Sequence, residues 1–322
     1  QPQQITSEYV RDAVRQMGSS GIGSCLKHFP GYGNNTDTHT GIAVDHRSLQ
    51  DLESYDLIPF RAGIEAGCGA ILVSHTIVEA LDPECPASLS PAVHDYLRNV
   101  MGFEGVIVTD DLVMGAITKQ YGAEEAAVLA VLAGNDLLEH RTKVGGRDIV
   151  NYTIEYDRAA YHSRWVAFRF DAQTRAKAVS RKDYSIRPQY PHDPLLPQSV
   201  GLENDARFNG YDHGHLVASA DRLFSREGND QTFYMTNMSP MNGNFNQKYW
   251  VTLEQFVQDK GRDASFADTL YVAKGGTIAD NMISGRVSSG RIVVPKYYYM
   301  ALLKVKNGVY SALGLWVEHK DY

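Results

Sequence analysis

Cysteine is scarce in this chain of 322 residues, which contains only Cys25, Cys68 and Cys85. A small fold held together by several disulfides is therefore excluded, because three cysteines can form no more than one pair. Their spacing also matches no cysteine-based metal motif. We therefore expect buried thiols at these positions.

Long apolar runs are missing as well. No stretch of about eighteen apolar residues occurs, so we expect no membrane-spanning helix. We expect no signal peptide at Gln1 of this sequence. The composition, 43% hydrophobic and 21% charged, instead suits a globular protein that is long enough for two domains.

Positive charge is scarce only in the first part of the chain. Residues 1–140 contain 7 Lys and Arg against 19 Asp and Glu, a net charge of −12. Residues 141–322 contain 24 Lys and Arg against 19 Asp and Glu, a net charge of +5. We expect the first part to repel nucleic acid and the second part to attract it.

Short apolar runs alternate with amphipathic stretches in the first part. The runs at 22–29, 69–75 and 105–109 predict buried parallel strands, and helices are predicted at 7–17, 49–66, 91–100 and 123–133. Such alternation predicts an α/β domain around a parallel sheet, whose chemistry lies at the carboxyl ends of the strands. Polar side chains lie at these ends: Lys27 and His28, Ser74 and His75, Asp110 and Asp111.

Three motifs of the first part are more specific than this alternation of strands and helices. They are K-H-F-P-G-Y-G at 27–33, D-T-H at 37–39 and V-T-D-D-L-V-M at 108–114. Together they resemble glycoside hydrolase family 3, and more narrowly its β-N-acetylhexosaminidase branch. The resemblance implies a retaining mechanism on N-acetylhexosamine glycosides, without a cofactor. It assigns Asp110 as nucleophile, His39 as acid/base oriented by Asp37, and Lys27, His28 and His75 as substrate-binding residues. Taken singly, Asp110 also suits a helix N-cap, and His28 and His75 suit satisfied core histidines.

The first part is short for a complete barrel of this family. An eight-stranded (β/α) barrel needs about 250 residues, whereas the resemblance here ends at residues 139–140. We therefore expect a partial (β/α) barrel of about four βα units over 1–141, with its glycosidase activity lost. Its open sheet edges favour pairing with another chain, and a homodimer is one form of such pairing.

Residues 142–147 (T-K-V-G-G-R) are polar and rich in glycine, and they are predicted to be a linker. Beyond them, β-branched and aromatic residues alternate with polar ones. An α+β domain is predicted over 148–322, with strands at 152–156, 165–170, 269–274, 291–294, 297–306 and 310–318.

Residues 211–254 carry the groups that phosphodiester hydrolysis needs. His215 can deprotonate water, and the amide oxygen of Asn246 is a hard ligand suited to Mg²⁺. Glu254 follows eight residues later, on the same face if this segment is helical, where it can order metal-bound water.

The pattern at 211–254 resembles the DNA/RNA non-specific endonuclease family, which has a ββα-metal active site. The matching residues are Asp212, Gly214, His215, Asn237, Pro240, Phe245, Asn246, Trp250, Leu253 and Glu254. The resemblance implies metal-dependent hydrolysis of DNA and RNA with Mg²⁺, Mn²⁺ or Ca²⁺, in a secreted or periplasmic protein. It further implies that Asn237 positions the site, Asp212 braces the loop and Arg181 contacts phosphate, although an ordinary surface role suits Arg181 equally well.

Two positions depart from the nuclease pattern. His213 stands where the family usually has Arg, and Met241 where it usually has Gln. A protonated His213 is expected to replace the missing positive charge, which predicts a more pH-sensitive activity. The alternative hypothesis is a remnant without activity, a chimera of two unrelated fragments joined near residue 142.

Overall fold

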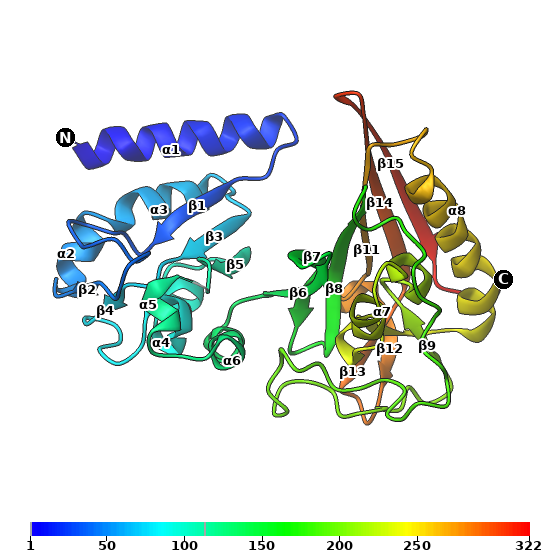
Figure 1. The fold of residues 1–322 in the computed structure, drawn as a ribbon. Helices are drawn as coiled ribbons and strands as arrows, with labels where there is room; N and C mark the ends of the chain where they lie inside the picture. The colour runs from blue at the N-terminus through cyan, green and yellow to red at the C-terminus, as the bar shows by residue number, and fades with distance from the viewer. Residues whose placement is uncertain (1, 113) are drawn as a thin grey trace. The chain divides into compact units, whose positions relative to one another are not determined.

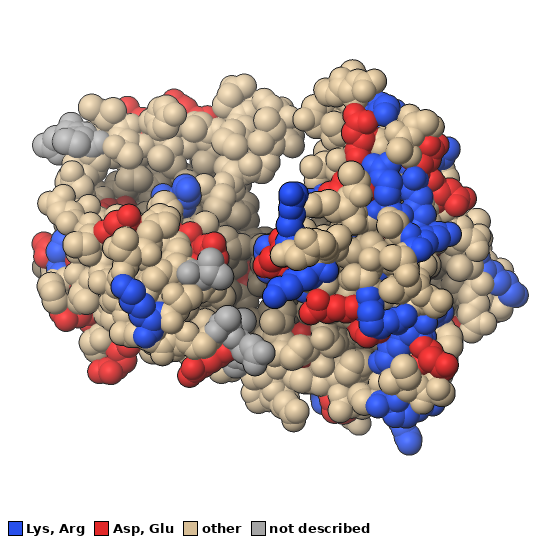
Figure 2. Space-filling model, in the orientation of Figure 1, with Lys and Arg blue, Asp and Glu red and all other residues tan. Residues whose placement is uncertain are grey.

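The computed structural model describes residues 2–112 and 114–322. Gln1, and Val113 of the aspartate motif, lie outside the described residues. The chain forms two compact units that divide between Leu137 and Leu138. No helix in the described residues has both the length and the apolar character needed to cross a bilayer. Lys and Arg side chains gather on the visible face of the second unit, and few are seen on that of the first (Figure 2).

The first unit contains a three-stranded parallel sheet in the order β1-β3-β5, and a separate parallel pair, β2 and β4 (Figure 1). Helix α1 packs on α3. The strands are β1 Cys25–Phe29, β2 Val44–Asp45, β3 Ala70–Val73, β4 Ile77–Val78 and β5 Val106–Thr109. The helices are α1 Pro2–Ser19, α2 Leu49–Ser54, α3 Leu57–Glu65, η1 Ala87–Leu89, α4 Pro91–Asp95, η2 Tyr96–Val100, α5 Gly115–Thr118 and α6 Ala123–Ala133.

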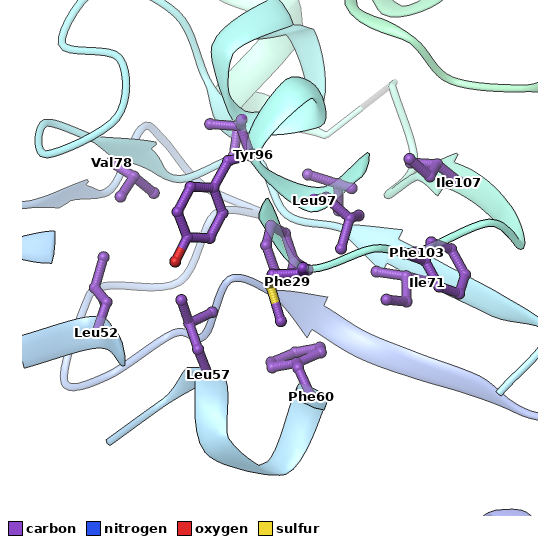
Figure 3. Close-up of a cluster of buried hydrophobic side chains, with 14 residues drawn as sticks. Phe29, Leu52, Leu57, Phe60, Ile71, Val78, Tyr96, Leu97, Phe103 and Ile107 are labelled. Carbon is purple, nitrogen blue, oxygen red and sulfur yellow. The ribbon is translucent and has the colours of Figure 1, made fainter. Parts of the chain in front are cut away.

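The core of the first unit lies between these strands and helices (Figure 3). Phe29 on β1 meets Phe60 on α3 edge to face, with ring centroids 5.2 Å apart. Ile71, Leu97 and Ile107 are fully buried in the same cluster. Burying each such side chain contributes about 1.5–3 kcal/mol, which fixes the strand ends that carry the polar residues.

Two expectations for this unit need correction. The described sheet has three parallel strands rather than about four, because the strand after α6 joins the antiparallel sheet of the second unit. Strand β1 is also less buried than expected: only Phe29 is buried, since β1 lies at the edge of the sheet. For the same reason Cys25 is exposed, whereas Cys68 is buried and Cys85 half-buried, and all three thiols are free.

The second unit is built on a six-stranded antiparallel sheet in the order β15-β14-β11-β8-β7-β6 (Figure 1). Each of the six strands predicted beyond residue 148 is present. The large sheet comprises β6 Leu137–Val144, β7 Arg147–Asp157, β8 His162–Phe170, β11 Thr269–Gly276, β14 Tyr297–Lys306 and β15 Val309–Glu318. The shorter strands are β9 Asp212–His215, β10 Met238–Met241, β12 Ile283–Val287 and β13 Ile292–Pro295, which pair as β9–β10 and β12–β13.

The expected linker at 142–147 is instead the turn of the β6–β7 hairpin. Gly145 and Gly146 have φ angles of 56° and 78°, the left-handed conformation that two-residue hairpin turns require. Residues 142–144 belong to β6 and residue 147 to β7, so the predicted linker is part of one hairpin and only its two glycines form the turn.

The helices of the second unit include α8 Val251–Arg262, which packs against β8 and β11 (Figure 1). A side-chain carbon added at Gly261 would lie 2.3 Å from Phe170 of β8, so only glycine permits this close approach. The other helical segments are η3 Ser219–Arg222, α7 Arg226–Gln231, η4 Met235–Asn237, η5 Phe245–Trp250 and η6 Asp280–Met282.

Candidate functional site

A cavity of about 610 Å³ opens in the second unit between β9, the helical segments η5 and α8, and the loop around residue 181. Residues far apart in the sequence meet here. Six of the residues expected from the sequence line this cavity: Arg181, Asp212, His213, His215, Asn246 and Glu254.

Strand β9 presents its residues through an antiparallel ladder with β10, in which His215 pairs with Met238 and Asp212 with Met241. Met241 is fully buried, and a side-chain carbon added at Gly214 would lie 2.3 Å from its sulfur. Glycine at 214 therefore makes room for Met241. The departure at Met241 consequently lies in the packing behind β9, outside the set of cavity-lining residues.

His215 is held by its own backbone and by aromatic neighbours. Its carbonyl accepts a hydrogen bond of 3.2 Å from Trp250 Nε1, and Phe233 meets its ring edge to face at 5.0 Å. Nε2 of His215 has no hydrogen-bond partner in the described part of the chain. Burial, and then the positive charges of Arg181 and other neighbours, lowers the pKa of His215 to about 3. The ring is therefore neutral at physiological pH, with a nitrogen available to accept a proton.

Asn237 lies just before β10 and is fully buried, outside the set of cavity-lining residues. Its side-chain amide donates to the carbonyls of Val217 at 2.9 Å and Thr232 at 2.7 Å. Its Oδ1 accepts from the backbone N–H of Val217 at 2.8 Å. Asn237 thus fixes the segment that follows His215 and acts on the site through the backbone.

Asp212 connects β9 to the helical segment η5. Its Oδ2 accepts hydrogen bonds from Asn246 Nδ2 at 3.0 Å and from Gln247 Nε2 at 2.8 Å. Because a carboxylate can only accept, the nitrogen of the Asn246 amide must face Asp212. The side-chain oxygen of Asn246 is then the atom that can bind a cation.

Asn246 and Glu254 line the same cavity, as their spacing predicted. The segment between them begins with a π-type hydrogen bond, in which the N–H of Val251 donates to the carbonyl of Asn246. Such π-helical turns shift the phase of the side chains and are frequent at functional sites.

Glu254 has charged neighbours that the sequence reading missed. Lys274 Nζ lies 2.9 Å from Asp221 Oδ2 and 4.0 Å from Glu254 Oε1, and the side chains of Lys274 and Asp221 are fully buried. Burial raises the pKa of Glu254 to about 7, against the lowering effect of Lys274. The sequence could have indicated the burial of Lys274. On β11 every second residue faces inward, and Lys274 follows Leu270 and Val272 in this alternation.

The structure argues against the role expected for His213. Its ring is stacked between Tyr190 and Phe208, with centroids 4.2 Å and 4.3 Å away, and its Nε2 donates to the carbonyl of Ala206 at 2.8 Å. Burial lowers the pKa of His213, so the neutral form is favoured. Burial of the ring therefore disfavours the positive charge that was expected to replace arginine.

Arg181 is the one Lys or Arg side chain among the described residues that line the cavity. Its guanidinium lies 4.3 Å from the centre of the Tyr184 ring and 5.5 Å from that of Phe233. Stacking of this kind orients the cation while leaving its donors exposed. Arg181 is thus placed to meet an anionic ligand.

In the first unit, the structure brings the expected pair Asp37 and His39 together, and it also places His28 near Asp110. His39 Nδ1 lies 2.6 Å from Asp37 Oδ1, and this contact raises the pKa of His39. His28 Nε2 lies 3.7 Å from Asp110 Oδ2, at the carboxyl ends of β1 and β5. Burial lowers the pKa of His28. Lys27 precedes His28 on β1 and is exposed.

His75 behaves differently from these residues. Its Nε2 donates to the carbonyl of Asp111 at 2.9 Å, and its Nδ1 contacts Ser88 Oγ at 2.7 Å. The side chain is fully buried, and burial lowers its pKa. Both ring nitrogens are used within the protein, so His75 fits a satisfied core histidine better than the expected substrate contact.

A metal in this chain would have few protein ligands. Among the residues that the structure describes, no three His, Cys, Asp or Glu side chains are grouped so as to hold an ion. The donors that line the cavity of the second unit include the amide oxygen of Asn246 and the carboxylates of Asp212 and Glu254, and the buried Oε1 of Glu254 has no hydrogen-bond partner among described atoms. This donor set fits a hydrated hard cation and does not fit a fully protein-ligated one.

Two family models match the chain. Residues 133–322 match the DNA/RNA non-specific endonuclease family, and residues 1–149 match the N-terminal domain of glycosyl hydrolase family 3. Both resemblances seen in the sequence are thereby confirmed.

The curated relatives match the first part of the chain. A beta-hexosaminidase of Stenotrophomonas maltophilia strain K279a is 42% identical over 138 residues, which is 42% of this chain and 41% of the relative. A beta-hexosaminidase of Xylella fastidiosa strain M23 is 42% identical over 115 residues, 35% of this chain and 34% of the relative. The chain spans about two fifths of the length of the first of these relatives.

Solved structures resemble each part separately. A glycoside hydrolase family 3 beta-N-acetylglucosaminidase from Paenibacillus covers 39% of this chain and 24% of its own, with 40% identity and a TM-score of 0.38. A structure of the EndoG/EndoGI complex covers 57% of this chain and 76% of that chain, with 23% identity and a TM-score of 0.46.

Proposed function

This chain belongs, through residues 133–322, to the DNA/RNA non-specific endonuclease family, and we propose that its second unit hydrolyses phosphodiester bonds of DNA and RNA without sequence preference. The observation that carries the proposal is the neutral, unpartnered Nε2 of His215 in one cavity with Asn246 and Glu254. In this proposal, β9, β10 and α8 form the ββα-metal arrangement of the family.

His215 is the general base of the proposed reaction. Its Nε2 takes a proton from the water that attacks phosphorus, and the neutral ring is ready to do so. A bound phosphate brings negative charge to the cavity, which raises the pKa of His215 and makes the ring a stronger base. Arg181, exposed at the cavity, pairs with the phosphate and offsets part of its charge.

Asn246 would hold Mg²⁺ or a similar hard cation through its amide oxygen, with Glu254 ordering water around it. When bound, such an ion stabilises negative charge on the phosphate and on the leaving oxygen. Asp212 fixes the direction of the Asn246 amide, and Asn237 fixes the backbone after His215. Asp212 and Asn237 thereby keep the base His215 and the cation ligand Asn246 at the same cavity.

The first prediction concerns the cation. Plasmid DNA and RNA are expected to be degraded with Mg²⁺ and to stay intact with EDTA. Asn246→Leu removes the amide oxygen at similar volume, and we expect the rate at limiting Mg²⁺ to fall at least about 10-fold. Gel analysis of plasmid cleavage measures both effects.

The matched control for this test is Asn99→Leu, which removes an exposed asparagine of the first unit and should leave the rate unchanged. Undiminished cleavage by Asn246→Leu, or cleavage that persists in EDTA, would contradict the assignment of Asn246. A folded parent protein that cleaves neither DNA nor RNA would favour a remnant without activity.

The second prediction concerns the pKa of Glu254, about 7 in the folded protein against an ordinary value of 4.5. A raised pKa means that stability from the protonated form is complete below about pH 4.5 and is lost as pH rises through about 7. Glu254→Gln stays neutral, so in EDTA it should melt higher than the parent at pH 8, by on the order of 5 °C.

Thermal unfolding followed by tryptophan fluorescence at pH 5 and at pH 8 measures this difference. The chain contains three tryptophans, Trp165, Trp250 and Trp316, and all of them lie in the second unit. Equal melting temperatures of parent and variant at both pH values would show that Glu254 is already ionised at pH 5. The rate of cleavage by the parent protein should instead be higher at pH 8 than at pH 5, because the ionised carboxylate orders water. For the same reason, Glu254→Gln should not cleave.

A retaining β-N-acetylhexosaminidase in the first unit is the second candidate function. The Asp37–His39 contact and the position of Asp110 after β5 favour it, and the 42% identity to beta-hexosaminidases supports it. We propose the parallel sheet β1-β3-β5 as part of the family's (β/α) barrel. Release of nitrophenol from a chromogenic N-acetylglucosaminide, compared between the parent and Asp110→Asn, is the corresponding test.

A further inference from the structure

His319 lies in the segment that follows β15, and its ring is fixed by two backbone groups. Nδ1 lies 2.8 Å from the carbonyl oxygen of Pro295, and the backbone N–H of Asn242 donates to Nε2 at 2.7 Å. A carbonyl can only accept and a backbone N–H can only donate. The proton of the neutral ring is therefore on Nδ1, and Nε2 is an obligatory acceptor. Burial lowers the pKa of His319, which agrees with a neutral ring.

Asn242 in turn organises the start of the helical segment η5. Its Oδ1 accepts hydrogen bonds from the backbone N–H groups of Asn244 at 2.9 Å and Phe245 at 3.4 Å. Its own carbonyl accepts from the backbone N–H of Asn246 at 2.8 Å. The backbone position of Asn246 is thus set by Asn242, one hydrogen bond away from His319.

The rest of the final segment contacts the same turn. Asn244 Nδ2 donates to Asp321 Oδ1 at 2.5 Å, and the ring of Tyr322 stacks on that of Tyr249 with centroids 4.4 Å apart. Residues 319–322 therefore contact both ends of the turn that carries Asn246, and the side chain of His319 accepts the hydrogen bond from the N–H of Asn242.

We propose that His319 is a positioning residue for the site, which holds the amide of Asn246 at the cavity through the backbone of Asn242. The proposal rests on the proposed function, since it concerns the residue assigned there to the cation. Partners one step removed from a metal ligand commonly change metal affinity by about 10–100-fold when they are lost.

A purely structural role for His319 makes a different prediction. The ring packs against Phe245 at 5.0 Å and Tyr298 at 5.2 Å, so it also contributes to the core. A leucine at 319 keeps much of that packing but offers no acceptor to Asn242. Glutamine keeps an acceptor oxygen at a similar distance from the backbone. The two variants therefore separate packing from hydrogen bonding.

The experiment measures Mn²⁺ binding by isothermal titration calorimetry for the full-length parent, His319→Leu and His319→Gln. We expect the dissociation constant of His319→Leu to rise at least about 10-fold, and that of His319→Gln to stay within about 3-fold of the parent. Hydrogen exchange of the Asn242 amide should become faster in His319→Leu and remain protected in His319→Gln. Cleavage by His319→Leu should recover as Mg²⁺ is raised.

His192→Gln is the matched control. His192 also has both ring nitrogens against backbone carbonyls, those of Leu202 and Leu196, but it has no contact with Asn242. Parent-like Mn²⁺ binding and parent-like exchange of the Asn242 amide in a folded His319→Leu protein would overturn the proposal. If His319→Leu does not fold, His319→Phe supplies the comparison without a side-chain acceptor. A parent without cleavage refutes the proposed function, while the exchange of the Asn242 amide still decides the role of His319.

Discussion

Replacing His215 by alanine is expected to lower the rate of plasmid cleavage by about 10²–10⁴-fold, the usual contribution of a positioned general base. The pKa of His215, lowered to about 3, leaves its ring neutral, and the unpartnered Nε2 can accept the proton of water. The substitution leaves Asn246 and Glu254 in place. The affinity for divalent cations should therefore change little while turnover falls.

Imidazole added to the His215→Ala protein supplies a sharper form of this test. The cavity has a volume of about 610 Å³ and gains further space when the ring is removed, so a free imidazole can enter. Partial recovery of cleavage by imidazole is expected, and none for Asn246→Leu. His46→Ala, which removes an exposed histidine of the first unit, should cleave like the parent. A fully active His215→Ala protein would rule out the proposed base.

Replacing Lys274 by methionine is expected to destabilise the second unit by about 3–5 kcal/mol, because it leaves Asp221 buried without its cation. Lys274 Nζ lies 2.9 Å from Asp221 Oδ2, and neither side chain is exposed. Urea unfolding followed by tryptophan fluorescence reports this unit, since all three tryptophans lie in it. The midpoint should shift to lower urea with an unchanged slope.

The double variant Lys274→Met with Asp221→Leu should recover part of the lost free energy of unfolding, because the buried carboxylate that lost Lys274 is then removed as well. Lys306→Met is the matched control: its ion pair with Asp268, 2.8 Å long, is partly exposed, and its loss should cost less than about 1 kcal/mol. Equal costs for Lys274→Met and Lys306→Met would show that the buried pair contributes no more than a surface one.

Several elements were predictable from local pattern alone. The helix at 123–133 and the strand at 297–306 were placed at their observed bounds, because their apolar periodicity and flanking turns act over a few residues. The bulk of the candidate site was predictable for a different reason. His215, Asn246 and Glu254 lie in a motif whose order and spacing resemble a known family, so their meeting at one cavity was expected.

The positions whose structural setting differs from what the sequence suggested depend on contacts between distant segments. His213 was expected to carry charge, yet its ring is enclosed by Tyr190 and Phe208, and the resulting burial favours the neutral form. His75 was expected to bind substrate, yet Ser88 and the carbonyl of Asp111 occupy its ring nitrogens. No spacing along the chain reports such partners.

The sequence by itself determined that this chain joins an acidic α/β part to a basic α+β part, and it predicted the residues that we propose for the hydrolytic chemistry. Hydrophobic periodicity and motif order are local properties, and the chain displays them directly. Only the tertiary structure decided which ionisable groups are charged and what holds them. The burial of Lys274 beside Asp221 and the contact of His319 with Asn242 arise when segments 53 and 77 residues apart pack together. Desolvation and hydrogen-bond partners are set at that step, and they determine the pKa of each group.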